Sequence, residues 1–391
     1  PTAPTVTAHP AACAAGRWAL LAAVELAVVA WLVAHVRGRP GPAPAQPAPP
    51  RAAVVVLLVT LTLAVRVPLA WLDPGIGAFA RASGIAAQQL LAGENPYTRV
   101  NPRADAGTYQ YPAASLLVHT AFVAVLPGRA WGEDLLDVRA VLWATDVAAV
   151  VLLAAAGSRL GGRRAGTAAA LLYAVHPTLV RESAIVVAND LIVALAAAAA
   201  AVAAVNGRRL LAGLLVGLAI SVKPAAVVLV PVLLLAQGVF AAGLAGVTAI
   251  ALQVPFLLLP SPGLHGLVAM AEPVTRPEPL ELLIMSVWYP LYAATGGAPP
   301  LDVTAAVGVV AALATATWAG WRLRRWSRTP PVAACAAYAL PLLVAAVFAP
   351  VQRHNYQGWY LTSFLLAASL TTGRATDGAT DTSFPPRQDP A

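Results

Sequence analysis

Long apolar segments separated by short polar connections run through most of the 391-residue chain. A helix needs about 20 apolar residues to cross a bilayer, and fewer where the membrane is locally thin. Backbone groups inside a bilayer must be hydrogen-bonded within the protein, so this pattern predicts helices rather than open strands. Eleven segments are candidate spans: residues 17–36, 52–71, 134–157, 164–178, 190–206, 208–222, 224–237, 239–259, 301–321, 331–349 and 356–372. The sequence therefore predicts an all-α fold, a polytopic transmembrane helical bundle of about eleven spans.

Composition supports a membrane protein. Hydrophobic residues make up 59% of the chain and charged residues only 11%, whereas soluble proteins carry about 25% charged residues. The net charge is +8, but the cations lie in short clusters between apolar segments. That placement is typical of topology signals rather than of a nucleic-acid surface, so we expect membrane lipids and no nucleic acid as partners. The heavy use of Ala, Pro and Arg is typical of a high-GC bacterial genome, which predicts a multi-pass protein of the bacterial plasma membrane.

The basic clusters predict which loops face outward, because cytoplasmic loops are enriched in Lys and Arg. With the clusters inside, span 52–71 leaves the cytoplasm and the connection 73–112 is external. Span 134–157 must then return, which requires that the apolar segment 111–126 does not cross. We expect that segment to lie in, or dip into, the outer leaflet. The clusters are Arg37/Arg39/Arg51, Arg159/Arg163/Arg164, Arg208/Arg209 and Arg322/Arg324/Arg325/Arg328.

The same pattern divides the chain into three parts. Residues 1–51 are expected to form a peripheral first helix and a Pro/Ala-rich linker. Residues 52–372 carry the remaining candidate spans and are expected to form the catalytic domain. Residues 373–391, GRATDGATDTSFPPRQDPA, are polar and predict a disordered cytoplasmic tail.

The external connection from Asp73 to Pro112 is the first candidate for chemistry. Long connections are usually functional or disordered, and this one, which we expect to carry interfacial helices, contains carboxylates, cations and aromatic residues such as Tyr97. Later external loops add further polar groups. A carboxylate can take a proton and cations can stabilise developing phosphate charge, so these groups suit a reaction with an anionic leaving group. The additional candidates are Arg181, Glu182, Asp190, Lys223, Arg353 and His354.

Each candidate also has a purely structural interpretation, which the sequence leaves open. Asp73 and Asp190 could cap helix ends. Lys223 could extend its ammonium to the membrane interface, and Arg353 with His354 could hold a lipid headgroup. Tyr97 could belong to an interfacial aromatic belt.

Asp146 differs from these candidates because it lies near the middle of span 134–157. A carboxylate at that depth is costly and should be paired. Arg139 is on the same predicted helix but two turns away, so we expect the partner of Asp146 on another helix.

Several short motifs resemble the GT-C superfamily of membrane glycosyltransferases, and among them the bacterial mannosyltransferases that depend on polyprenyl-phosphate mannose. The matching features are an acid after an early span (Asp73), LLAGENPY (90–97), Tyr111-Pro112, GRRAG (162–166), HPTLVRES and NDLIVALAAA (176–198), GLAISVKPAAVVLVPVLLL (217–235) and Trp359-Tyr360. They extend over residues 52–370 in a consistent order. Ala113 replaces the second Pro of a Tyr-Pro-Pro motif, and Ala188 replaces a His before Asn-Asp. These departures affect the subfamily and substrate more than the fold.

The resemblance implies a hexose transfer, with mannose expected, from a polyprenyl-phosphate sugar donor to a lipid or glycan acceptor of the cell envelope. It implies inversion at the anomeric carbon and an active site on the external face. Asp73 would be the catalytic base, and Asp190 matches a second external acid. Lys223, Arg353 and His354 would hold the lipid phosphate, while Tyr97, Arg181 and Glu182 are the remaining candidates for binding the donor or substrate. No cluster has the spacing of zinc ligands, so no metal ligands are predicted; a divalent cation as cofactor is left open.

Two other classes of function compete with an enzyme. A transporter or lipid flippase would need charged residues along a path through the bilayer, for which Asp146 is the one clear mid-membrane candidate. A non-catalytic partner in envelope assembly would have no need of reactive groups on three separate external loops.

Overall fold

The structure is a computed structural model, and it describes residues 10–37, 49–72, 78–97, 111–126, 136–258, 288, 295, 301–326, 330–349 and 358–378. These residues contain helices and no strand, so the all-α prediction is confirmed for them. The helices are α1 (Pro10–Arg37), α2 (Ala52–Leu72), α3 (Ala78–Leu91), α4 (Ala113–Val125), α5 (Leu136–Gly161), α6 (Arg163–Val175), α7 (Pro177–Arg181), η1 (Glu182–Val186), α8 (Asp190–Val205), α9 (Arg209–Val222), η2 (Pro224–Leu229), α10 (Val230–Gln237), α11 (Val239–Leu258), α15 (Leu301–Arg324), α16 (Pro331–Val347) and α17 (Gly358–Gly378).

These helices follow the predicted apolar segments closely. Within the described residues, four are long and apolar enough to cross a membrane, at Ala52–Leu72, Val138–Gly161, Val239–Phe256 and Val303–Arg324. Shorter apolar helices occupy Leu26–Arg37, Ala113–Val125, Asp190–Val205, Arg209–Val222, Pro224–Gln237 and Pro331–Val347. The protein is therefore a multi-pass membrane protein, while the number of eleven spans stays a prediction.

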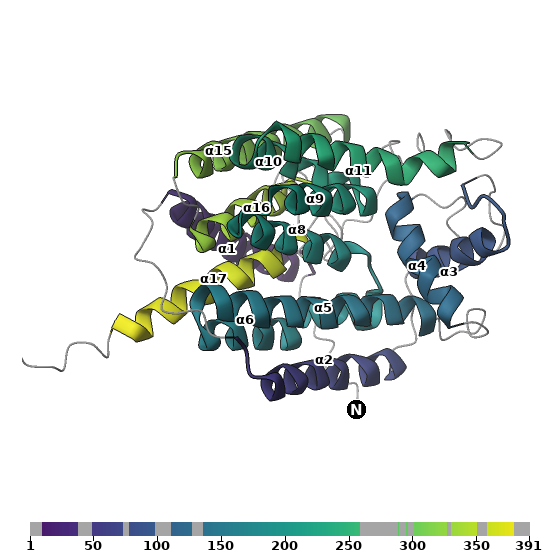
Figure 1. The fold of residues 1–391 in the computed structure, drawn as a ribbon, viewed down its shortest axis with the longest axis horizontal. Coiled ribbons are helices and arrows are strands. Elements are labelled where there is room, and N and C mark those ends of the chain that lie inside the picture. Colours follow the sequence, from purple (N-terminus) through teal and green to yellow (C-terminus); the bar gives the residue numbers. More distant parts are fainter. Residues whose placement is uncertain are drawn as a thin grey trace, which may run out of the picture.

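Most of the long helices run side by side in one bundle (Figure 1). At its centre lie α8 and α16, whose residues are almost all buried, and many of these are alanines. Small residues let transmembrane helices approach closely. The contact of α5 with α6 shows how tight this is, because a Cβ on Gly157 would lie 2.6 Å from the Cα of Gly166.

At one end of the bundle lie α3 and α4, with α4 running across the direction of the long helices (Figure 1). The apolar cluster that joins them includes Ala86, Leu116 and Phe256 of α11. An orientation across the bundle is what we expected of segment 111–126. Whether it crosses the membrane stays a prediction.

The described members of the basic clusters gather at the opposite end. The Nε of Arg163 donates to the carbonyl of Pro49 at 3.0 Å, and Arg322 Nη2 donates to the carbonyl of Arg37 at 2.6 Å. The turn that carries Arg208 joins α8 to α9, at the other end of that hairpin from Asp190. This arrangement is what the positive-inside rule requires if one face of the bundle is cytoplasmic.

The fold can be compared with the predictions for the two chain ends. The first helix, expected to be peripheral, lies against α17, with the Trp31 ring 5.4 Å from that of Phe364. At the C-terminal end α17 continues to Gly378, past the predicted start of the tail at 373. The segment TTGRATDG contains no Pro that would stop the helix. Residues 379–391 lie outside the described residues.

Candidate functional site

Lys223 lies at a break between two helices. Because the residue before a proline is pushed away from helical conformation, α9 ends at Val222 and Lys223 is extended, with φ −151° and ψ 119°. Pro224 then begins the short helix η2. At this break 19% of the Lys223 side chain is exposed.

Asp190 is the first residue of α8 and meets this lysine. Its Oδ1 accepts a hydrogen bond from Lys223 Nζ at 2.6 Å, and the Asp190 side chain is 1% exposed. The indole N–H of Trp359, at the start of α17, donates to the same oxygen. The Lys223 ammonium also lies 4.8 Å from the centre of the Trp359 ring. Two elements that are far apart in sequence, α8 and α17, thus hold one ammonium group.

The neighbouring Asn189 joins this cluster to the end of the bundle that carries α4. Its Nδ2 donates to Ser115 Oγ of α4 and to the carbonyl of Val222, both at 3.4 Å. Asn189, and not Asp190, precedes the helix at the capping position, and it makes no side-chain capping bond. Asp190 therefore does not have the N-cap role left open by the sequence.

Glu182 lies close enough to interact electrostatically with the Asp190–Lys223 pair. The pKa of Glu182 is raised from its usual 4.5 to about 8, mainly by burial and also by the charge of Asp190, while Arg181 and Lys223 act in the opposite direction. The Glu182 carboxyl is consequently largely protonated near neutral pH and able to donate a hydrogen bond. Arg181, one residue earlier, is exposed.

The backbone that carries Glu182 is unusual. Residues 182–186 form a π-helical turn, a rare conformation that occurs frequently at functional sites. It ends at Val187, which has φ 56° and ψ 57°. A β-branched residue in the left-handed region is strained and persists only where its surroundings impose it. Nothing in the apolar pattern of the sequence indicated this turn.

Tyr97 lies in a different place from the Asp190 cluster. Its hydroxyl donates to the carbonyl of Tyr111 at 2.8 Å, and its ring meets the Phe256 ring edge-on at 5.4 Å. These contacts hold Tyr97 beside Tyr111, which lies shortly before α4, and beside α11. A role for Tyr97 in binding substrate stays a prediction, while Asp73, Arg353 and His354 lie outside the described residues.

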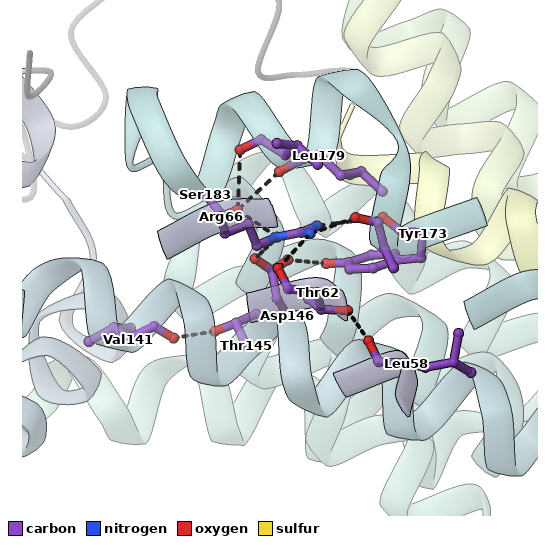
Figure 2. A network of polar contacts seen from close by, with 11 residues as sticks. Leu58, Thr62, Arg66, Val141, Thr145, Asp146, Tyr173, Leu179 and Ser183 are labelled. Atoms are coloured by element: carbon purple, nitrogen blue, oxygen red, sulfur yellow. Dashed lines mark hydrogen bonds and ion pairs between the residues drawn. The ribbon is translucent and has the colours of Figure 1, made fainter. Parts of the chain in front are cut away.

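A second polar cluster surrounds Asp146, and its members Arg66 and Tyr173 were not identified from the sequence (Figure 2). Arg66 of α2 donates from Nε to Asp146 Oδ2 at 2.6 Å, and both side chains are 0% exposed. Tyr173 of α6 donates its hydroxyl to Asp146 Oδ1 at 2.8 Å. The expectation that Asp146 pairs with another helix is confirmed. The feature of the sequence that could have identified the partner was Arg66 itself, a charged residue inside an otherwise apolar span.

Metal ligands were not predicted, and the described residues contain no group of three or more His, Cys, Asp and Glu side chains placed to hold an ion.

The fold is similar to solved membrane enzymes. ArnT from Cupriavidus metallidurans in the apo state is 18% identical, with a TM-score of 0.53 over 83% of this chain and 60% of that one. The oligosaccharyltransferase of Archaeoglobus fulgidus, tethered to an acceptor peptide, is 14% identical, with a TM-score of 0.52 over 82% and 49%. ArnT bound to undecaprenyl phosphate is 17% identical over 83% and 60%, with a TM-score of 0.49. This chain thus spans about half to three fifths of the length of those proteins.

Residues 108–350 match the model of glycosyltransferase family 87, and the chain therefore belongs to that family. This membership confirms the resemblance to GT-C membrane glycosyltransferases found in the sequence, and the similarity of the fold to these solved structures agrees with it. A comparison with curated protein sequences gives no match.

Proposed function

We propose that the protein is an inverting glycosyltransferase that moves a hexose, mannose in our proposal, from a polyprenyl-phosphate donor. The acceptor is a glycan or glycolipid of the cell envelope, and the reaction takes place on the outer face of a bacterial plasma membrane. The observation that carries the proposal is the ammonium of Lys223, held by Asp190 and Trp359 at the end of the bundle remote from the basic clusters. Family membership supports the class of reaction.

The chemistry of the site suits a lipid-phosphate leaving group. Transfer forms a bond between the acceptor oxygen and the anomeric carbon and breaks the bond from that carbon to the phosphate oxygen. Negative charge then grows on the phosphate, where a preorganised cation stabilises it. Lys223 is partly exposed and fixed in direction, so it can meet that charge. Arg181, Arg353 and His354 are the further cations that we propose for donor binding.

Inversion requires the acceptor to attack from the side opposite to the phosphate. The base must accept the proton of the acceptor hydroxyl on that side, within hydrogen-bond reach. We propose Asp73, the residue that follows α2, for this role. Asp190 would act mainly through Lys223, since its carboxylate holds the ammonium. Glu182, largely protonated near neutral pH, can donate a hydrogen bond to a sugar or phosphate oxygen.

The transporter alternative gains no support from Asp146. Its charge is balanced by Arg66 and both of its oxygens accept hydrogen bonds from the protein. A carboxylate so engaged is poorly suited to carrying ions or protons in turn.

The direct test is transfer by the purified protein in lipid nanodiscs. Radiolabelled polyprenyl-phosphate mannose, glucose and arabinose would be offered separately with a lipid extract as acceptor, and nucleotide sugars would serve as the comparison. We expect product from a lipid-linked donor, with mannose preferred. Transfer from a nucleotide sugar alone would overturn the proposal. Sealed vesicles of both orientations, given an impermeant acceptor, then report the face on which transfer occurs.

A further inference from the structure

Arg66 connects four elements within the buried part of the bundle (Figure 2). Besides its bond to Asp146 of α5, its Nε donates to Ser183 Oγ of η1 at 3.0 Å. Its Nη1 donates to the carbonyl of Ala174, near the end of α6, at 2.7 Å. The guanidinium group is planar and directs several N–H groups at fixed angles, so one Arg can hold partners that a Lys cannot. Arg66 thus links α2 to α5, α6 and η1 at one point.

A second arginine holds the last turns of α2. Arg139 of α5, only 5% exposed, donates to the carbonyl of Ala70. Pro68 lies between Arg66 and Ala70 within α2, and a proline inside a helix removes one backbone hydrogen bond. The end of α2 is therefore held by contacts with α5 and less by its own helical bonds. In the sequence, Asp73 follows directly on Leu72, the last residue of this helix.

Ser183 links Arg66 to the Asp190 cluster. Ser183, which accepts from Arg66, directly follows Glu182, whose pKa depends on Asp190 and Lys223. Both belong to the π-helical turn that ends at the strained Val187. Such a turn keeps its shape only if neighbouring groups hold it. The bond from Arg66 to Ser183 is one such contact, and it lies inside the bundle.

We infer that Arg66 is a positioning residue for glycosyl transfer: it holds the end of α2 in fixed register with η1, which carries Glu182 beside Asp190 and Lys223. This inference rests on the proposed function. Stability alone does not explain why the protein has the buried Arg66–Asp146 pair, because replacing a buried ion pair with apolar residues of similar volume is often neutral or stabilising. Misplacing catalytic groups by about 1 Å can reduce the rate about 10²-fold.

The decisive variant removes both charges together, Arg66→Met with Asp146→Leu. We expect it to fold, because no unpaired charge is left buried, with a modest loss of stability from the Tyr173 hydroxyl and the Ala174 carbonyl, which lose their partners. We also expect kcat to fall at least about tenfold while the KM for the donor changes little, because misplaced groups act on the chemical step. A folded double variant with wild-type kcat would overturn the inference.

Two further variants separate positioning from stability. Ser183→Ala breaks the link to η1 and leaves the Arg66–Asp146 pair in place, so kcat should fall there too, even if the double variant fails to fold. Thr145→Val is the matched control: Thr145 is buried beside Asp146, but its hydroxyl bonds to the carbonyl of Val141 in its own helix at 2.8 Å (Figure 2). It should retain wild-type kcat. Full activity in Ser183→Ala would contradict the inference.

A distance measurement tests positioning without any assay of transfer. Spin labels on Leu72→Cys and Arg181→Cys, both exposed positions, would be placed in a Cys13→Ser background; the remaining Cys335 is buried. We expect a narrow distribution of distances in the wild-type background and with Thr145→Val, and a broader or shifted one with Ser183→Ala or the double variant. Identical distributions would overturn the inference. If the wild type transfers no lipid-linked sugar, the proposed function fails, but the distances still decide the role of Arg66.

Discussion

Lys223 and Asp190 form an ion pair with 2.6 Å between Nζ and Oδ1, although 33 residues separate them in the chain. The pair closes one end of the hairpin of α8 and α9, whose turn carries the basic Arg208 and Arg209 at the other end. A carboxylate with 1% exposure holds an ammonium with 19% exposure. The charge of Lys223 is therefore fixed in place and still accessible to a ligand.

Replacing Lys223 tests its proposed role at the donor phosphate. Lys223→Ala should reduce kcat/KM for the lipid donor about 10²-fold or more, because a cation aimed at developing charge is lost. Lys223→Arg should retain more activity, since it keeps the charge. Steady-state kinetics with the polyprenyl-phosphate sugar would measure both, with Arg164→Ala, an exposed cation at the basic end, as the control. Equal activity in all of these proteins would show that Lys223 only holds the helix at the interface.

Asp73→Asn separates a catalytic base from a helix cap. Loss of a general base typically reduces the rate about 10²–10⁴-fold, whereas Asn caps a helix as well as Asp does. We expect a folded protein with the full rate loss. Glu94→Gln, an exposed acid of the same connection, is the control and should behave as the wild type. Normal turnover by Asp73→Asn would move the search for the base to Asp190 and Glu182.

The raised pKa of Glu182 predicts that the stability of the folded protein depends on pH. Its pKa is about 8 in the folded protein and about 4.5 in the unfolded chain, so the folded state keeps a proton that the unfolded state loses. The contribution of Glu182 to the free energy of unfolding is therefore fully present below its unfolded pKa. It declines, by up to about 1.4 kcal/mol per pH unit, as the pH rises toward the folded pKa.

Glu182→Gln removes this titration while keeping the shape of the side chain. Melting temperatures of the detergent-solubilised wild type should fall more steeply than those of the variant between about pH 5 and pH 8. Parallel curves would show that Glu182 is ionised in the folded protein.

The orientation of the bundle can be measured with reporter fusions. Fusions after Ala106 and after Arg129 should both be external, because α4 lies across the long helices (Figure 1). The basic clusters before and after α4 are expected on the same face of the membrane, so one crossing precedes α4 and one follows it. An external Ala106 with a cytoplasmic Arg129 would mean that 111–126 spans the membrane, and the later loops would change sides.

The sequence by itself determined the helices. Hydropathy is a local property, summed over about 20 residues in a bilayer, and the predicted segments at 52–71, 190–206 and 208–222 match α2, α8 and α9 within a residue or two. Prolines carry comparably local information: the predicted segments 208–222 and 224–237 already leave Lys223 between them, directly before Pro224. The positions of the basic clusters can also be read directly from the sequence, and they predicted that these clusters lie at one end of the bundle.

Only the tertiary structure decided which side chains meet. An apolar span with one Arg does not say which neighbour receives the charge, because that depends on how the helices are rotated against each other. Arg66 and Asp146 are 80 residues apart, and Trp359 is 169 residues from Asp190. The π-helical turn and the left-handed Val187 likewise follow from contacts that impose them, since no local preference of these residues favours them.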